Sequence, residues 1–489
     1  MSAWLGIDLG TSGLKVLLLA DDHRVIGTAA VPLTVSRPAP LHSEQAPADW
    51  WAACCSALDT LAAAHPDWMA RVRGIGLSGQ MHGAVLLDAA DAVLRPAILW
   101  NDGRSAEECH ELARRCPALS RIAGNLAMPG FTAPKLLWVA RHEPEIFAAT
   151  RCVLLPKDWL RFCLTGEKVS EMSDAAGTLW LDVARRDWSD ALLDATGMTR
   201  AQMPRLVEGS ELAAHLSPAL CRRWGLPPGV AVAGGAGDNA ASAIGIGAVE
   251  PGAGFLSLGT SGVLFVVNEA FRPNPGSAVH AFCHAVPGRW HQMSVMLSAA
   301  SCLEWVTRLC GRASEAALLG EVAQLDAAAR AAAPLFLPYL CGERTPHNDP
   351  HAQGVFFGLG FGHGPADLGW AVLEGVAFAF RDGLAALQAA GTGVQCLSLV
   401  GGGARSALWA QLLADVLGVE IVTHLDGEAG AALGAARLAW LADGASQDAV
   451  CMPPPVSARF CPTTDCDAFE TRYQRFRALY PALQASFRS

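Results

Sequence analysis

The stretch Asp8-Leu9-Gly10-Thr11-Ser12-Gly13 has the composition of a tight turn between two strands. Apolar residues precede and follow it, and nearly the same six residues return as Ser257-Leu258-Gly259-Thr260-Ser261-Gly262. The second copy begins about half a chain length further on and also leads into an apolar, strand-like run, Val263 to Val267. The repeat therefore predicts two similar domains, each opening with a β-hairpin.

Both turns have the residues of a phosphate-binding loop. Gly lets the backbone approach a phosphate closely, so that N–H groups and Thr or Ser hydroxyls can surround it. Only the first copy has an acid, Asp8, where the second has Ser257. Either turn alone is equally consistent with a plain hairpin. The pair favours a nucleotide held in a cleft between two domains, with one carboxylate available for a metal ion.

The composition argues against several classes of protein. Hydrophobic residues make up 52% and charged residues 17% of the chain, which allows a large core and argues against disorder. The net charge of −10 argues against a nucleic-acid partner. No stretch approaches the ~20 apolar residues of a membrane helix, and no secretory leader is recognisable. Fifteen scattered Cys without a C-x-x-C pair fit reduced thiols, so we expect a cytoplasmic protein.

Predicted strands and helices alternate in both halves of the chain, which is typical of α/β domains with mixed sheets. Gly and Pro cluster between Gly245 and Gly254, just before the second hairpin. We therefore place one domain over residues 1–245 and a second over residues 246–489. In the second domain, Glu315 to Ala333 is expected to be helical, and a helical tail is expected after Pro453–Pro455.

Asp238 is the first candidate for chemistry. It follows Gly234-Gly235-Ala236-Gly237 at the end of an apolar strand, so its carboxylate is expected to project into a cleft that a ligand can approach closely. A carboxylate in this position can accept the proton of a substrate hydroxyl during phosphoryl transfer. The local pattern fits equally well an N-cap for a helix that begins at Ala240.

The segment Gly74–Gly79 matches G-x-G-x-x-G, the fingerprint of dinucleotide-binding domains. Such a fingerprint opens a helix, whereas here a strand-like run, Ala84–Leu87, follows, so we reject that interpretation. Between them, Gln80, Met81 and His82 lie in a loop bracketed by glycines and offer hydrogen bonds to a polyol. On the local pattern alone, a structural role for His82 is as well supported as a binding role.

A second glycine-rich loop, Gly401 to Ser406, joins a predicted strand to a predicted helix. Its glycines allow close contact with a base or with phosphates, and a helix N-terminus favours negative charge. It is not a Walker A loop, because no G-x-x-x-x-G-K-[ST] occurs in the chain. A tight strand–helix turn explains the same residues.

Three further polar segments have alternative explanations. Trp100 to Arg104 could bind a sugar, although an internal pair of Asp102 and Arg104 is the favoured explanation. Gly342 to His347 is as well suited to fixing its own loop as to binding a ligand. Glu374, in the middle of an apolar helix, is expected to be buried with a partner.

Together these segments resemble the FGGY carbohydrate kinases of the actin/hexokinase superfamily, and in particular their xylulokinase branch. Two stretches resemble the family's signature regions, GFTAPKLLW (Gly130–Trp138) and GVFFGLGFGHG (Gly354–Gly364). The resemblance extends from the first hairpin to about Ala442. The motifs that match the xylulokinase branch are GQMHG (79–83), WNDGR (100–104), MSDAAGT (172–178), AGDNAA (236–241), LSAAS (297–301) and GERTPHN (342–348).

The resemblance implies two actin/hexokinase-like (ribonuclease H-like) domains around an interdomain cleft, with the sugar on the side of residues 1–245 and the nucleotide on the side of residues 246–489. By position, Asp238 matches the general base and Asp8 the carboxylate beside the metal ion and phosphates. The sugar would be held by Gln80, Met81, His82, Asp238 and Asn239, the phosphates by Gly10, Thr11, Ser12, Lys15, Gly259 and Thr260, and the nucleoside by Gly402, Gly403 and Ser406.

The implied reaction is the ATP- and Mg²⁺-dependent phosphorylation of D-xylulose to D-xylulose 5-phosphate, in pentose (xylose) catabolism. Two alternatives remain at this point: a kinase of the same family acting on another ketose or polyol such as ribulose, and a non-catalytic, actin-like nucleotide-binding protein. A homodimer is an expectation that rests on the resemblance alone.

Overall fold

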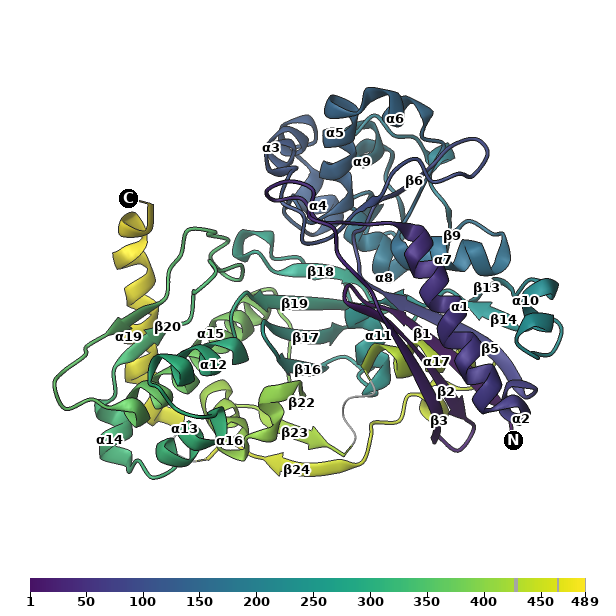
Figure 1. The fold of residues 1–489 in the computed structure, drawn as a ribbon. Helices are drawn as coiled ribbons and strands as arrows, with labels where there is room; N and C mark the ends of the chain where they lie inside the picture. The colour runs from purple at the N-terminus through teal and green to yellow at the C-terminus, as the bar shows by residue number, and fades with distance from the viewer. Residues whose placement is uncertain (426–429, 464–465, 489) are drawn as a thin grey trace.

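The structure is a computed structural model that describes residues 1–425, 430–463 and 466–488. It contains two seven-stranded sheets, with a further layer above the first of them (Figure 1). The first sheet consists of β1 (Ala3–Leu9), β2 (Gly13–Ala20), β3 (Val25–Pro32), β5 (Val72–Gly79), β13 (Leu212–His215), β14 (Ala231–Ala233) and β15 (Ala236–Gly237). The second consists of β16 (Ala253–Leu258), β17 (Gly262–Asn268), β18 (His280–Cys283), β19 (Trp290–Met296), β22 (Cys396–Val400), β23 (Glu420–His424) and β24 (Val456–Phe460).

The two sheets repeat one topology. The order β3-β2-β1-β5-β14 in the first sheet corresponds to β19-β17-β16-β22-β23 in the second. In each, three antiparallel strands are followed by two strands that run parallel to the first strand of the hairpin. The predicted duplication and the expected mixed α/β fold are therefore confirmed.

Helices cover both faces of the first sheet. Leu5, Ile7 and Leu9 of β1 pack with α1 (Pro47–Ala64) and α7 (Pro156–Thr165), as the two-residue period of a strand requires. The opposite face, which carries Asp8, lies against α17 (Gly430–Ala442). A Cβ atom at Gly76 of β5 would lie 1.8 Å from the Ala435 carbonyl oxygen of α17. Glycines in the strands therefore let this helix approach the sheet.

The long segment between β5 and β14 builds the upper layer (Figure 1). Its apolar side chains form one core with the face of the second sheet that carries Phe255 and Phe265. The helices of the segment, besides α7, are α3 (Ala106–Arg115), α4 (Leu119–Ala123), α5 (Thr132–His142), α6 (Pro144–Ala149), α8 (Met172–Ala175), α9 (Asp190–Asp194) and α10 (Pro218–Arg223). Its short strands include β6 (Val85–Leu87), β7 (Ala97–Ile98), β8 (Cys152–Leu154), β9 (Val169–Glu171), β10 (Leu181–Asp182), β11 (Asp187–Trp188) and β12 (Arg205–Val207).

The other face of the second sheet packs against helices from the second half of the chain. Glu315 to Ala333, which was expected to be helical, forms two helices: the chain interrupts the helix at Ala323–Asp326, and Asp326 caps the second piece by accepting a hydrogen bond from Ala329 N. Within the described residues no helix is long and apolar enough to cross a membrane. The helices are α12 (Ala300–Leu309), α13 (Glu315–Val322), α14 (Ala327–Ala332), α15 (Pro365–Ala389), α16 (Ala407–Leu417) and α19 (Cys466–Leu483), with the hairpin β20 (Leu335–Leu337) and β21 (Val355–Phe357).

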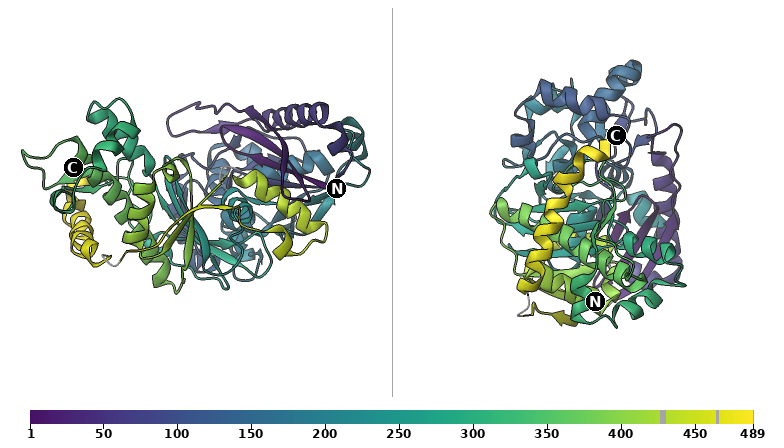
Figure 2. Two further views of the ribbon diagram at one scale, coloured as in Figure 1. Left: turned by 90° about the horizontal axis from the view of Figure 1, so that it is seen from below. Right: turned by 90° about the vertical axis from the view of Figure 1, so that its left-hand side faces the viewer.

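The tail after Pro453–Pro455 is not helical throughout, because it first adds the edge strand β24 to the second sheet and only then forms α19 (Figure 2). The expected partner of Glu374 comes from this tail. Both carboxylate oxygens of Glu374 accept hydrogen bonds from Arg472 of α19, at 2.7 and 2.6 Å. The sequence also predicts an Ala-rich helix from Ala429 to Leu441, and its first residue, Ala429, lies outside the described residues.

Two short helices cross between the halves. Helix α11 (Asp238–Gly245) follows the first sheet, and α17 comes from the second half of the sequence but packs on the first sheet. They touch through backbone, since a Cβ atom at Gly434 would lie 1.7 Å from the Ala241 carbonyl oxygen. The domain boundary at residues 245 and 246 stays a prediction. The contact between α11 and α17 connects the two parts on either side of this boundary.

Candidate active site

Two carboxylates meet at one end of the first sheet. In the parallel pairing of β1 with β5, Asp8 lies opposite Ser78, and Ser78 in turn lies opposite Ala236 of β15. Asp238 follows two residues later, as the first residue of α11. Burial and then the charge of Asp8 raise the pKa of Asp238 to about 6, and burial also raises the pKa of Asp8. Two partly buried acids this close favour either a shared proton or a cation.

The local geometry excludes the capping alternative for Asp238. The cap residue of α11 is Gly237, and Asp238 is already helical. Its Oδ1 atom accepts hydrogen bonds from the backbone N–H of Asn239 at 2.7 Å and from the Asn239 side-chain amide at 2.9 Å. Asn239 thus fixes one carboxylate oxygen and leaves Oδ2 without a hydrogen bond among the described residues, available to a substrate hydroxyl.

A fully buried cluster of charges, which sequence reasoning missed, supports the 234–238 loop from behind. Arg161 donates a hydrogen bond to the Gly234 carbonyl oxygen, and Ser173 Oγ accepts one from Gly237 N at 3.1 Å. The motif around Ser173 was recognised, but nothing in the sequence pairs it with Arg161. The charged members, all 0% exposed, are Lys157, Asp158, Arg161, Glu171 and Asp174, and Lys157 Nζ lies 2.7 to 3.3 Å from the three carboxylates.

The predicted sugar loop lies beside this acid pair. A Cβ atom at Gly237 would meet the Met81 side chain at 2.9 Å, so Met81 packs directly against the residue before Asp238. His82 adopts a left-handed backbone conformation (φ 70°), and its Nδ1 atom lies 2.7 Å from the Gly177 carbonyl oxygen. Burial is the main reason why the pKa of His82 falls to about 3. The ring is therefore neutral, Nδ1 carries its proton, and Nε2 is left as an acceptor.

Gln80 is used internally. Its Oε1 atom accepts a hydrogen bond from Thr11 Oγ1 at 2.9 Å, and its Nε2 atom donates one to Gln45 Oε1 at 2.9 Å. The side chain is only 2% exposed. Gln80 therefore ties the first hairpin turn to the sugar loop, and the sugar contact expected of it remains a prediction.

Aromatic rings that the sequence analysis did not select form one wall of the sugar loop. The ring of His82 packs edge-on against Phe131 at 4.6 Å between centroids, and Phe131 also contacts His280 and Phe282 of β18. Lys135, on α5, donates a hydrogen bond from its buried Nζ atom to the His82 carbonyl oxygen at 2.9 Å. Phe131 and Lys135 lie in the recognised signature GFTAPKLLW, so the resemblance marked the segment without giving either residue a role.

The first hairpin turn is held in a fixed shape. Gly10 N donates a hydrogen bond to Gly13 O at 3.0 Å, and Thr11 Oγ1 accepts one from Trp100 Nε1 at 2.9 Å. Ser12 at its tip is exposed, and Lys15 pairs with Asp8 across β1 and β2. The turn thus presents small polar residues beside the two carboxylates.

The Trp100–Arg104 turn confirms the favoured internal pair. Arg104 donates from Nε to Asp102 Oδ1 at 2.9 Å and from Nη2 to Oδ2 at 2.7 Å. Asp102 is 2% exposed and also accepts a hydrogen bond from Ser43 N. The pair fixes the turn from which the exposed Trp100 reaches the first hairpin.

The second hairpin turn and the Gly401–Ser406 loop line one cavity of about 610 Å³. Gly401 has φ 90°, and a Cβ atom there would lie 2.9 Å from the Leu258 carbonyl carbon, so glycine alone permits the two loops to touch. Ser406 Oγ accepts a hydrogen bond from Trp409 N at 3.3 Å and thereby caps α16. The cavity is lined by the five nucleotide-binding candidates of the second half, Gly259, Thr260, Gly402, Gly403 and Ser406, and also by Glu304, Glu315 and Trp409. The other four candidates, Gly10, Thr11, Ser12 and Lys15, belong to the first hairpin and do not line it.

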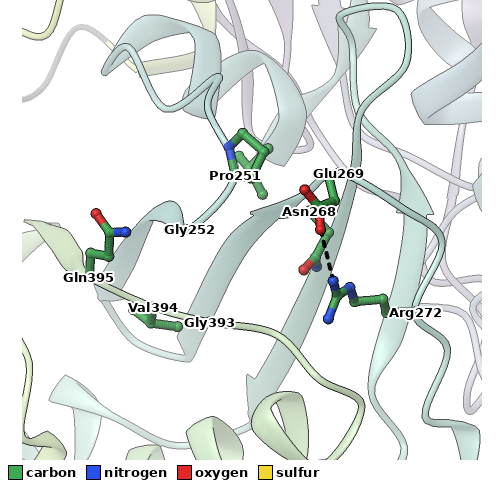
Figure 3. A pocket seen from close by; sticks show the side chains of 9 residues that line it. Pro251, Gly252, Asn268, Glu269, Arg272, Gly393, Val394 and Gln395 are labelled. Atoms are coloured by element: carbon green, nitrogen blue, oxygen red, sulfur yellow. Dashed lines mark hydrogen bonds and ion pairs between the residues drawn. The ribbon is translucent and has the colours of Figure 1, made fainter.

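A second, smaller cavity of about 240 Å³ lies at the opposite end of the same strands (Figure 3). It is lined by residues before β16, after β17 and before β22, so it is separated from the hairpin turn by the length of the strands. Its one cation, Arg272, pairs with Glu269 at 3.2 Å. This cavity therefore has no part in the site described above.

The comparisons with known proteins agree with this arrangement. Residues 3–245 match the N-terminal domain, and residues 254–442 the C-terminal domain, of the FGGY family of carbohydrate kinases. The chain is 53% identical over 483 residues to xylulose kinase of Escherichia coli (strain K12), covering 98% of this chain and 99% of that one. It is 54% identical over 456 residues to xylulose kinase of Klebsiella pneumoniae, covering 93% of each.

A crystal structure of a xyloylose kinase from Brucella ovis superposes on this one with a TM-score of 0.96, at 54% identity and over 99% of each chain. Xylulose kinase from Rhodospirillum rubrum follows, with a TM-score of 0.92 at 30% identity over the full length of both chains. The expected family and fold are thereby confirmed, and the chain belongs to the FGGY family of carbohydrate kinases.

Proposed function

We propose that this protein transfers the γ-phosphate of ATP to the terminal hydroxyl of D-xylulose, giving D-xylulose 5-phosphate and ADP. The observation that carries the proposal is the position of Asp238 between Asp8 and the Met81–His82 loop, with one carboxylate oxygen left open. The relatives named xylulose kinase, at 53% and 54% identity, support D-xylulose as the substrate.

In the proposed mechanism, Asp238 Oδ2 accepts a hydrogen bond from the C5 hydroxyl and then its proton. The C5 oxygen forms a bond to the γ-phosphorus while the bond from that phosphorus to the β–γ bridging oxygen breaks, and ADP leaves. Because the transition state of phosphoryl transfer is loose, positioning and charge stabilisation dominate. Asn239 fixes Asp238, and the neutral His82 offers Nε2 to another hydroxyl of the sugar.

The phosphate chain would lie between the two hairpin turns, and the nucleoside in the cavity beside α16. Gly10, Thr11, Ser12 and Lys15 would face the transferred phosphate. Gly259 and Thr260 would contact the β-side phosphates, and the Gly402–Ser406 segment would hold the nucleoside. Closing of the cleft would exclude water, which otherwise competes as the acceptor.

The residues present fit Mg²⁺. Asp8 Oδ1 is buried and has no hydrogen-bond partner among the described residues. Protein sites usually hold Mg²⁺ through one or two carboxylates together with substrate phosphates, so a cluster of three or more protein ligands is not required. Mg²⁺ bound at Asp8 would neutralise charge on the phosphates. A cytoplasmic location and a homodimer belong to the same proposal and rest on the sequence expectations.

The test is ADP release with Mg-ATP and D-xylulose, D-ribulose, L-ribulose, glycerol or no sugar. Turnover dominated by D-xylulose is expected, and Asp238→Asn should lower kcat about 10²- to 10⁴-fold, because it removes the base but keeps the shape. The control is Asp49→Asn, which changes an exposed acid in the first turn of α1 and should leave kcat unchanged. Turnover dominated by another sugar would refute the substrate, and a variant retaining a tenth of wild-type kcat would refute the base.

A further inference from the structure

The loop formed by residues 342–349 is attached to the second sheet. It is fixed through Thr345, whose Oγ1 atom donates to the Ala278 carbonyl oxygen at 3.0 Å and accepts from Val295 N at 3.1 Å. Thr345 N also donates to Val295 O at 3.1 Å. These bonds attach the loop beside β18 and β19, the strands nearest to the upper layer (Figure 1).

Arg344, the preceding residue, lacks an acidic partner within the described part of the chain. Arg344 is half-buried as a residue, and no described carboxylate forms an ion pair with it. Its neighbour Glu343 does not neutralise it, because burial raises the pKa of Glu343 to about 8. Burial lowers the pKa of both His82 and His280, and the Arg344 charge lowers both further. The geometry agrees, because Thr345 is bonded to Ala278, two residues before His280, and the rings of His280 and His82 both pack against Phe131.

Both imidazoles are hydrogen-bonded through the same ring nitrogen. The Nδ1 atom of His82 lies 2.7 Å from the Gly177 carbonyl oxygen, and that of His280 lies 3.0 Å from Asn125 Oδ1. Because both partners are acceptors, each Nδ1 carries the proton and each Nε2 offers a lone pair. Two acceptors and one charged donor suit a polyhydroxy ketone, which donates from its hydroxyls and accepts through its carbonyl oxygen.

The other end of the loop is held by the C-terminal helix α19, which lies along the outer side of the second sheet's helices (Figures 1 and 2). Tyr480 donates a hydrogen bond from its hydroxyl to Asp349 Oδ2 at 2.8 Å, and its ring stacks on His347 at 3.6 Å. Tyr339 OH lies 3.1 Å from His347 Nε2 and completes the contact. The family match ends at residue 442, so this helix lies outside the matched region.

We propose that Arg344 binds the carbonyl end of the sugar and that α19, through Tyr480, positions the loop that carries it. The phosphorylated end is at Asp238, which follows the first sheet, whereas the loop of Arg344 is attached beside β18 and β19 of the second sheet. Arg344 therefore serves the opposite end of the substrate, and the sugar is held from both halves of the chain. This inference rests on the proposed function and extends it to a substrate-binding residue and a positioning residue.

The experiment compares KM for D-xylulose with KM for ATP. Arg344→Met should raise the sugar KM roughly 10- to 100-fold, the range of a lost charged hydrogen bond, and leave the ATP KM within about twofold. Arg344→Lys should recover part of the loss, because it keeps the charge but not the planar fork. Tyr480→Phe removes the bond to Asp349 and the bond that the hydroxyl accepts from Gln484, and it should raise the sugar KM several-fold.

The chain offers a matched control for Tyr480. Tyr473 lies on the same helix, is equally buried, and donates a similar bond at 2.6 Å to Asp382 of α15. Tyr473→Phe should lower stability as much as Tyr480→Phe but leave the sugar KM unchanged.

The outcomes separate the two proposals. Wild-type protein without ketose-dependent turnover would end both the proposed function and this inference. An active wild type whose Arg344→Met variant keeps the sugar KM would refute the role of Arg344 alone. Equal sugar KM values in the two tyrosine variants would refute the positioning role of α19.

Discussion

A substitution in the contact between α11 and α17 tests whether this contact holds Asp238 in place. We expect Gly434→Ala to force the two helices apart. The added Cβ atom would lie 1.7 Å from the Ala241 carbonyl oxygen and 2.6 Å from its carbon, whereas unstrained contacts between such atoms exceed ~3 Å. Helix α17 cannot move away, because on its other side it touches Gly6 and Gly76 of the sheet.

Two opposing effects determine how much Gly434→Ala changes the stability of the folded state. Replacing Gly by Ala inside a helix favours the folded state by about 1 kcal/mol. Overpacking a rigid contact costs about 1–3 kcal/mol and sometimes more, and here the obstacle is backbone rather than a flexible side chain. The expected net loss of stability is about 2 kcal/mol. Asp238 lies one helical turn before Ala241, so a displacement of about 1 Å there should lower kcat by ten- to a hundredfold.

The assay combines the thermal unfolding midpoint with kcat under Mg-ATP and saturating sugar. Gly320→Ala is the matched control, since this glycine also lies in a helix, α13, but a Cβ atom there would meet no atom within 4 Å. The control should raise Tm slightly and leave kcat unchanged. A Gly434→Ala variant with wild-type Tm and wild-type kcat would show that the close backbone contact does not hold Asp238.

Two further predictions concern the titratable groups of the site. Because the pKa of Asp238 is raised to about 6 and the base acts when deprotonated, kcat should be full above about pH 7 and should fall about tenfold per pH unit below the midpoint. Asp8→Asn should move this midpoint to lower pH in single-turnover measurements, since it removes the like charge; an unchanged midpoint would contradict the coupling. His82→Ala should raise KM for the sugar far more than KM for ATP, and equal increases would place His82 outside the sugar pocket.

Local sequence patterns were sufficient for the two hairpins and the repeated sheets, because each hairpin depends on residues that are close in sequence. They also sufficed to reject a dinucleotide fingerprint at Gly74–Gly79. The structure supplies the physical reason for those glycines. Gly74 and Gly76 lie within β5, and a Cβ atom on either would collide with or crowd the backbone of α17. The glycines are required by a helix that lies more than 350 residues further along the chain.

The features that the sequence did not reveal all depend on such distant contacts. Lys157 is a buried cation among three carboxylates, yet in the sequence PKDWLRF it is indistinguishable from a solvated lysine on a helix. His280 has no motif of its own and joins the aromatic wall of the predicted sugar loop only because β18 lies against Phe131. The cap that Ser406 provides for α16 was not predicted for a similar reason, since it depends on the helix boundary at Ala407.

The crossing helices also determine what the proposed boundary near residue 245 means. The two sheets repeat one topology, so the boundary separates two copies of one structural unit. The first copy, however, uses α17 from the second half to cover the face that carries Leu17, Leu19 and Asp8. Without that helix, the apolar side chains and the glycine-lined groove of this face would be open to water, at a cost of about 25 cal/mol per Å² of apolar surface. The two halves therefore repeat one topology but depend on each other for folding. The carboxylates of Asp8 and Asp238 lie in the region where the two halves contact each other.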